Sequence, residues 1–158
     1  MPAKFLTPLI VAFTLIPVGT AFAADDPAPA AAAPAPAAAP VEETGTKLSA
    51  ALTGANEAGG GDPDGTGSFT ARIDKDQLCY TLSSANISEA TMAHIHSGAA
   101  GANGPVYIGL PDLDAGEHCQ DIDADRAGPL KSKPQNYYVN IHNDDFPGGA
   151  IRGQLSKN

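Results

Sequence analysis

Short runs of alternating apolar and polar residues recur along the chain from about residue 46 onward, and each ends at Gly, Pro, Asn or Asp. The clearest run is 68–73, where Phe69, Ala71 and Ile73 alternate with polar side chains. Because successive side chains of a strand point to opposite faces of a sheet, this pattern predicts a strand with one buried face. By the same pattern we predict strands at 47–53, 68–73, 77–83, 91–96, 105–110, 120–124, 135–142 and 150–155.

No stretch of this region repeats its apolar residues with the helical period, and 126–134 is predicted to be a loop. The turn at 74–76 joins two of the predicted strands into a hairpin. About seven or eight short strands with regular turn signals indicate an all-β fold, a sandwich or a barrel of antiparallel strands.

The first 23 residues differ from the rest. Lys4 precedes a mostly apolar run that ends in the small-residue sequence Ala-Phe-Ala. This is typical of a signal peptide (1–23) that is cleaved after Ala23, which predicts a periplasmic or secreted protein with no membrane insertion after cleavage. An uncleaved anchor is the alternative, but the run is short and Pro8 and Pro17 interrupt it.

Residues 24–45 are nearly all Ala and Pro. Such a segment buries no core, and its prolines favour an extended spacer. It is either a tether or a passive linker. The remainder, 46–158, has the size of one domain.

The net charge of the chain indicates which kinds of partner it favours. Removal of Lys4 with the signal peptide changes the formal charge from -9 to -10. An acidic chain excludes nucleic acid and anionic membrane as expected partners. It suits cationic ligands, including metal ions, although a merely solvated surface has the same composition.

Cys79 and Cys119 are the two cysteines of the chain. Behind a signal peptide, such a pair predicts a disulfide formed in an oxidising compartment. The bond would close a loop of roughly 40 residues and contribute about 4 kcal/mol in the loop-entropy account. A metal ligand or a catalytic thiol is the alternative.

His94 and His96 lie two residues apart on a predicted strand, so both point to the same face, about 7 Å apart at the backbone. His142 ends another predicted strand on the polar face of that strand. The opposite faces of the two strands are apolar and are predicted to be buried. If the two strands are neighbours, the three imidazoles form a cluster outside the core.

Three neutral imidazoles are a ligand set that suits copper, and zinc as an alternative. Met92 shares the face of His94 and is a candidate auxiliary ligand for Cu(I), and Asp144 is a candidate hydrogen-bond acceptor for an imidazole. The alternative interpretation is that the histidines only hydrogen-bond to turns. His118, in an irregular region beside a cysteine, is a weaker candidate.

Four segments together resemble the CHRD domain, a module named from chordin and found in bacterial secreted proteins. They are LSAALTGANE at 48–57, AHIHSGAAGANGPV at 93–106, YVNIH at 138–142 and FPGGAIRGQL at 146–155. The resemblance covers essentially the whole domain. It implies a secreted β-domain, and a periplasmic or extracellular protein partner.

The His-x-His strand is also similar, more distantly, to copper–zinc superoxide dismutase, a Greek-key β-barrel. That similarity implies a Greek-key sandwich or barrel, immunoglobulin-like or superoxide-dismutase-like, with His94, His96 and His142 as copper ligands. Arg152 would match the arginine that guides the anion, although a structural or surface role is the other interpretation. The bridging histidine and the zinc-binding loop of that family have no counterpart in the sequence, and His118 is too far along the chain to serve.

These observations favour a secreted CHRD-type module that binds copper through three histidines at its surface without catalysis. A copper-dependent, dismutase-like oxidoreductase is one alternative. A metal-free protein-interaction module is the other.

Overall fold

The computed structural model describes residues 44–158, so the predicted signal peptide (1–23) and nearly all of the predicted linker (24–45) lie outside the described residues. Within this range strands alternate with short connections, and helices are few. The elements are β1 (Thr46–Thr53), η1 (Gly54–Asn56), β2 (Thr66–Asp74), β3 (Gln77–Ala85), β4 (Ala90–Ser97), β5 (Val106–Leu110), β6 (Glu117–Asp121), α1 (Ala124–Ser132), η2 (Pro134–Asn136), β7 (Tyr137–Asn143), β8 (Ile151–Gln154) and β9 (Ser156–Lys157).

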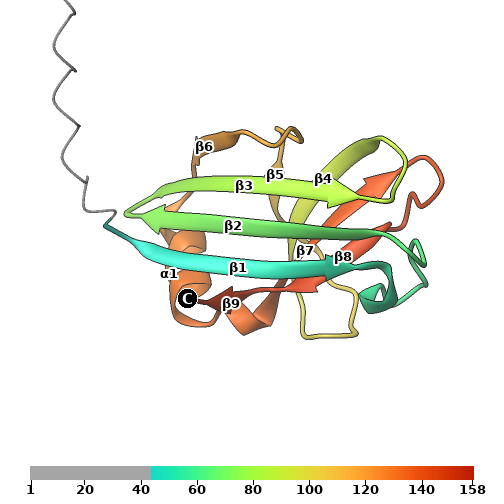
Figure 1. The fold of residues 1–158 in the computed structure, drawn as a ribbon. Coiled ribbons are helices and arrows are strands. Elements are labelled where there is room, and N and C mark those ends of the chain that lie inside the picture. The colour runs from blue at the N-terminus through green and yellow to red at the C-terminus, as the bar shows by residue number, and fades with distance from the viewer. Residues whose placement is uncertain (1–43) are drawn as a thin grey trace, which may run out of the picture. The chain divides into compact units, whose positions relative to one another are not determined.

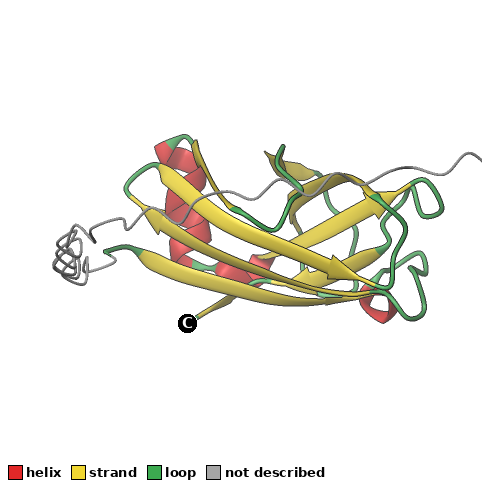
Figure 2. Cartoon of the chain, turned by 45° about the horizontal axis from the view of Figure 1, so that its top comes forward, coloured by secondary structure: helices red, strands yellow, loops and turns green. Residues whose placement is uncertain are grey.

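The strands form one antiparallel sheet in the order β5-β4-β7-β8-β1-β2-β3-β6, with β9 paired to β1. The sheet curls on itself, so that β1, β2 and β3 form the front layer of Figure 1 and β4, β5, β7 and β8 lie behind them. Figure 2 shows the same curl from another side. Strand β7 returns to lie beside β4, and β6 returns to lie beside β3, which are pairings of the Greek-key type. The predicted all-β antiparallel fold is confirmed.

The inner face of the curled sheet carries the hydrophobic core. On β2, Phe69 and Ile73 are at most 1% exposed and Ala71 is 8% exposed, as the alternation predicts. Phe69 lies opposite Leu82 of β3, and Ala71 lies opposite Tyr80. Burial of one large apolar side chain stabilises a fold by about 1.5–3 kcal/mol, so burial of this face stabilises the curled sheet.

The segment predicted to be a loop at 126–134 is largely helical, so that prediction is wrong. Helix α1 lies behind the end of β1–β3 that carries the β2–β3 turn (Figure 1), and it buries Ala127 and Leu130 completely. The helix has only two buried residues, and it contains Gly128 and Pro129. Its sequence therefore shows no helical period of apolar residues. Tertiary packing rather than propensity stabilises such a helix. Within residues 44–158, no helix is long and apolar enough to cross a membrane.

The sixth strand begins and ends three residues earlier than predicted, at Glu117–Asp121 instead of 120–124. Its sequence is almost entirely polar, so no alternation of apolar and polar residues marks where the strand begins and ends. Pairing with β3 places Cys119 directly opposite Cys79, and the two form the predicted disulfide.

We predict that removal of this disulfide destabilises the domain, because it ties edge strand β6 to β3 across a sequence separation of 40. The change Cys79→Ala with Cys119→Ala should lower the free energy of unfolding by about 4 kcal/mol, measured by urea denaturation. A reductant should bring the wild type down to the same stability and leave the double variant unchanged. Equal denaturation midpoints for the oxidised wild type and the variant would contradict the prediction.

Candidate metal centre

Pairing between β4 and β7 brings the three predicted ligands together. The strands are antiparallel neighbours, with Met92 opposite His142, His94 opposite Asn140 and His96 opposite Tyr138. The adjacency assumed from the sequence is therefore confirmed. His94 and His142 are diagonal neighbours on one face, a relation within reach of ring side chains.

The opposite faces of the same two strands belong to the core. Ala93 and Ile95 of β4 and Val139 and Ile141 of β7 are at most 2% exposed. A shift of either strand by one residue would exchange these side chains with the imidazoles, so burial of the apolar set fixes the side to which the histidines point.

The imidazoles converge. Ring centroids lie 5.2 Å apart for His94 and His142, 5.5 Å for His94 and His96, and 6.5 Å for His96 and His142. One ring nitrogen from each residue lies within 4.8 Å of the other two. Nδ1 of His94 is 3.3 Å from Nε2 of His142. The predicted cluster is confirmed.

Two backbone carbonyls determine which nitrogens are free. Nδ1–H of His96 donates to the Gly104 carbonyl (2.9 Å), and Nδ1–H of His142 donates to the Pro147 carbonyl (3.0 Å). Carbonyls only accept, so both rings carry their proton on Nδ1 and keep the lone pair on Nε2. Nε2 of His142 then accepts the Nδ1 proton of His94 (3.3 Å). A metal would replace that proton, so the converging ligand nitrogens are Nδ1 of His94 and Nε2 of His96 and of His142.

The free nitrogen of His96 has no partner. Its Nε2 atom is buried and makes no hydrogen bond. Buried polar atoms are almost always paired, so each exception calls for an explanation such as a bound ion. A metal held by the three nitrogens supplies that explanation and fits the residues present.

Two of the three histidines are less accessible than a surface site requires. His96 is 9% exposed and His142 is 8% exposed, while His94 is half-buried. They lie outside the hydrophobic core, as predicted, but the prediction of a surface site is wrong for His96 and His142. The loops that contain Gly104 and Pro147 cover this face, and the strand pattern could not show that.

Burial favours the neutral form of His94 and of His142. Desolvation lowers the pKa of His94, and proximity to His142 and His96 lowers it further. Desolvation also lowers the pKa of His142, with a smaller contribution from His96, against the hydrogen bond to Pro147, which raises it. Neutral imidazole is the form that binds a metal ion.

The predicted auxiliary residues occupy different surroundings. Met92 lies on the same face as His94 and is 48% exposed. Its role as an auxiliary ligand stays a prediction. Asp144 is exposed, and the two hydrogen bonds that orient imidazoles at the site go to backbone carbonyls instead. Its role also stays a prediction.

Arg152 of β8 is 2% exposed, so the surface role considered for it is wrong and the structural one fits. Its Nε lies 3.6 Å from Oε2 of Glu57, and its guanidinium covers the ring of Tyr138 at 3.7 Å. Tyr138 in turn stacks on His96, with ring centroids 4.9 Å apart. The strand parity on β7 places Tyr138 and Asn140 on the face of His142, but no local signal in the sequence points to Glu57.

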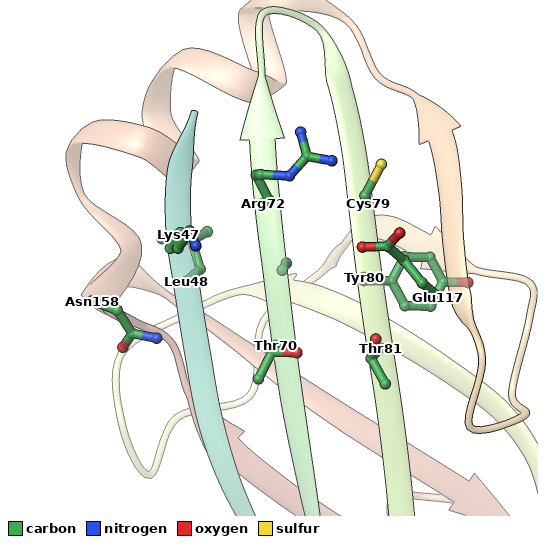
Figure 3. A pocket seen from close by; sticks show the side chains of 10 residues that line it. Lys47, Leu48, Thr70, Arg72, Cys79, Tyr80, Thr81, Glu117 and Asn158 are labelled. Carbon is green, nitrogen blue, oxygen red and sulfur yellow. The ribbon is translucent and has the colours of Figure 1, made fainter. Parts of the chain in front are cut away.

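His118 lies on edge strand β6, at a distance in the sheet from β4 and β7. Its Nε2 is 2.5 Å from Oδ1 of Asp114, and its Nδ1 is 3.6 Å from Oδ2 of Asp112. It is not part of the cluster. A separate depression on β1–β3 (Figure 3) has a mostly polar lining that includes Lys47 and Arg72 but no histidine.

In a comparison with protein families, the family model described as CHRD domain matches residues 48–155. Comparison with curated proteins found no match. Comparison with solved structures found none either.

We predict that the metal-free domain loses stability as the pH falls through the histidine range. The folded-state pKa values of His94 and His142 lie below the ordinary 6.5. Protons therefore bind the unfolded chain more readily, and the stability contributed by the neutral rings is present above pH 6.5 and is lost on acidification. Urea denaturation in the presence of a chelator, from about pH 7.5 to about pH 5.5, measures the decline.

The variant His94→Gln with His142→Gln is the control, and its decline should be shallower. Burial raises the pKa of Glu57, which works in the opposite direction. Glu57 is common to both proteins, so the difference between their slopes isolates the two imidazoles. Equal slopes would contradict the assignment of the pH dependence to the cluster.

Proposed function

The chain belongs to the CHRD-domain family, and we propose that its domain is a non-catalytic copper-binding module that uses His94, His96 and His142 as ligands. The convergence of the three ring nitrogens within 4.8 Å carries the proposal. The buried, unpartnered Nε2 of His96 supports it independently, because buried polar atoms are almost always paired and a metal ion would satisfy this one.

The donor set favours copper. The cluster consists of three histidines, with neither a thiolate nor a carboxylate among its members. Divalent copper binds a given set of nitrogen ligands more tightly than zinc does. Three nitrogens also leave a position for water, which suits the tetragonal preference of Cu(II). Zinc is the alternative occupant, since three imidazoles and a water make a tetrahedral site.

A copper oxidoreductase of dismutase type has less support. Arg152, the candidate for guiding an anion, is buried against Glu57 and therefore does not face solvent. Within residues 44–158, the three-histidine group is the one cluster of potential ligands that converges, so a second metal site has no counterpart there. The net charge of -9 also opposes the approach of an anion.

The proposed place of action is the periplasm or the extracellular space, after cleavage of the signal peptide. The disulfide between Cys79 and Cys119 supports this, because such bonds persist in oxidising compartments. In that compartment the proposed site would serve copper storage, delivery or sequestration, with or without a protein partner.

We predict that His94→Ala with His96→Ala abolishes tight copper binding by the tag-free protein. The double change removes two of the three converging nitrogens, so a calorimetric Cu(II) titration should lose its high-affinity phase, and the EPR signature of nitrogen ligands should change. His118→Ala is the matched control, because it removes a histidine outside the cluster and should leave both measurements as in the wild type.

Unchanged affinity in the double variant would refute the site. The titration repeated with Zn(II) shows whether copper is preferred. A dismutase assay of the copper-loaded protein separates the catalytic alternative: activity well above that of a copper–peptide complex would refute the non-catalytic assignment.

A further inference from the structure

Arg152 is a buried cation, and its contacts other than the ion pair with Glu57 lead toward the proposed metal ligand His96. Its side chain is 3% exposed and its main ionic partner is Glu57, whose side chain is 4% exposed. Isolated charges are rarely buried unless they are paired, and a buried ion pair is weak evidence for stability but can specify one arrangement of the groups around it. The remaining contacts of the guanidinium show what it specifies.

The first contact of the guanidinium is with the loop that contains Ala102 and Asn103. Nη2 of Arg152 donates to the carbonyl of Ala102 (3.0 Å) and to Oδ1 of Asn103 (2.9 Å). The next residue in the chain is Gly104, whose carbonyl accepts the Nδ1 proton of His96. The guanidinium therefore holds the loop immediately before the group that determines the tautomer of His96.

The second contact is a stack of planar groups. The guanidinium carbon of Arg152 lies 3.7 Å from the centre of the Tyr138 ring, and the rings of Tyr138 and His96 are inclined by only 3°. The Tyr138 hydroxyl accepts a hydrogen bond from the Gly104 amide (3.2 Å), so the stack and the loop are joined at that residue. The His96 ring is thus constrained on its face and at Nδ1.

Gly104 shows how closely the loop approaches the strand. A Cβ atom at this position would lie 1.7 Å from the Ser97 carbonyl oxygen, so only glycine fits. The backbone of Gly104 can therefore approach His96 and Tyr138, but its position depends on what holds the rest of the loop in place.

We propose that Arg152 is a positioning residue for the metal ligand His96: it holds the Gly104 loop and the Tyr138 ring so that His96 keeps its proton on Nδ1 and presents Nε2 to the metal. The proposal rests on the proposed copper function. Without Arg152, the Gly104 carbonyl moves away from Nδ1, and the proton can occupy Nε2, where it blocks the metal. Loss of a group that orients a ligand typically lowers metal affinity by about 10- to 100-fold.

The test uses the full-length protein with Arg152→Met and Glu57→Gln together, because removal of Arg152 alone would leave the Glu57 carboxylate buried and unpaired. The tautomer of His96 is read by ¹H–¹⁵N NMR of the ring in copper-free protein. The wild type should show the Nδ1–H form, and the double variant should show a mixture with the Nε2–H form. Copper affinity should fall by about 10- to 100-fold.

Two further variants sharpen the test. Asn103→Ala removes one contact of Arg152 and leaves the ion pair intact, so it should shift the tautomer in the same direction to a smaller extent even if the double variant fails to fold. Arg72→Met removes an arginine among the side chains of β1–β3 (Figure 3) and should leave the tautomer and the affinity as in the wild type.

An Nδ1–H tautomer in the folded double variant overturns the proposal, whether or not copper affinity falls, because the effect would then not act through His96. If the double variant does not fold, a wild-type tautomer in Asn103→Ala overturns it in the same way. If the wild type binds no copper, the proposed function fails, while the NMR comparison in copper-free protein still decides whether Arg152 positions the ring.

Discussion

The register of β4 against β7 is the constraint on which the candidate site depends. Burial of Ile95 and Val139, which face each other across the two strands and are 0% exposed, fixes that register. It thereby sends His94, His96 and His142 to the opposite face and makes them neighbours. The hydrophobic core and the histidine cluster therefore depend on the same strand pairing, and a shift in register that lost one would lose the other.

The face of the sheet that carries the histidines is also buried on β7, but its side chains are polar, whereas those of the core are apolar. All seven residues of β7 are buried, although alternate ones are polar. Loops that contain Gly104 and Pro147 cover this face, and their carbonyls pair with the imidazoles. Arg152 and Glu57 extend the same polar layer away from the site. This layer is only partly paired, because Nε2 of His96, Oδ1 of Asn140 and Oε1 of Glu57 are among its buried atoms that make no hydrogen bond.

How much of this the sequence predicts depends on the range of the interaction concerned. Alternation within a strand is local, so the strands other than β6 and β9, the face of each clustered histidine and the core positions of β2 follow from the pattern. Helix α1 does not, because two buried residues next to Gly128 and Pro129 leave no period. The burial of His96, and the contacts of Arg152 with Glu57 and Asn103, join segments that are far apart in the chain, and only the folded structure brings them together.

The unpartnered nitrogen of His96 links stability to binding. A buried polar atom without a partner costs a fold about 1–3 kcal/mol relative to the same atom in water. Pro147 and Gly104 have already taken the Nδ1 protons of two rings, so the protein cannot satisfy Nε2 of His96 by a change of tautomer without breaking one of those bonds. A cation at the centre of the cluster would remove the cost, and because it would bind only the folded arrangement it would also stabilise the fold. The metal-free domain is thus slightly less stable than it would be with Nε2 of His96 paired. The geometry that leaves this atom unpaired is also the geometry that a bound metal would require.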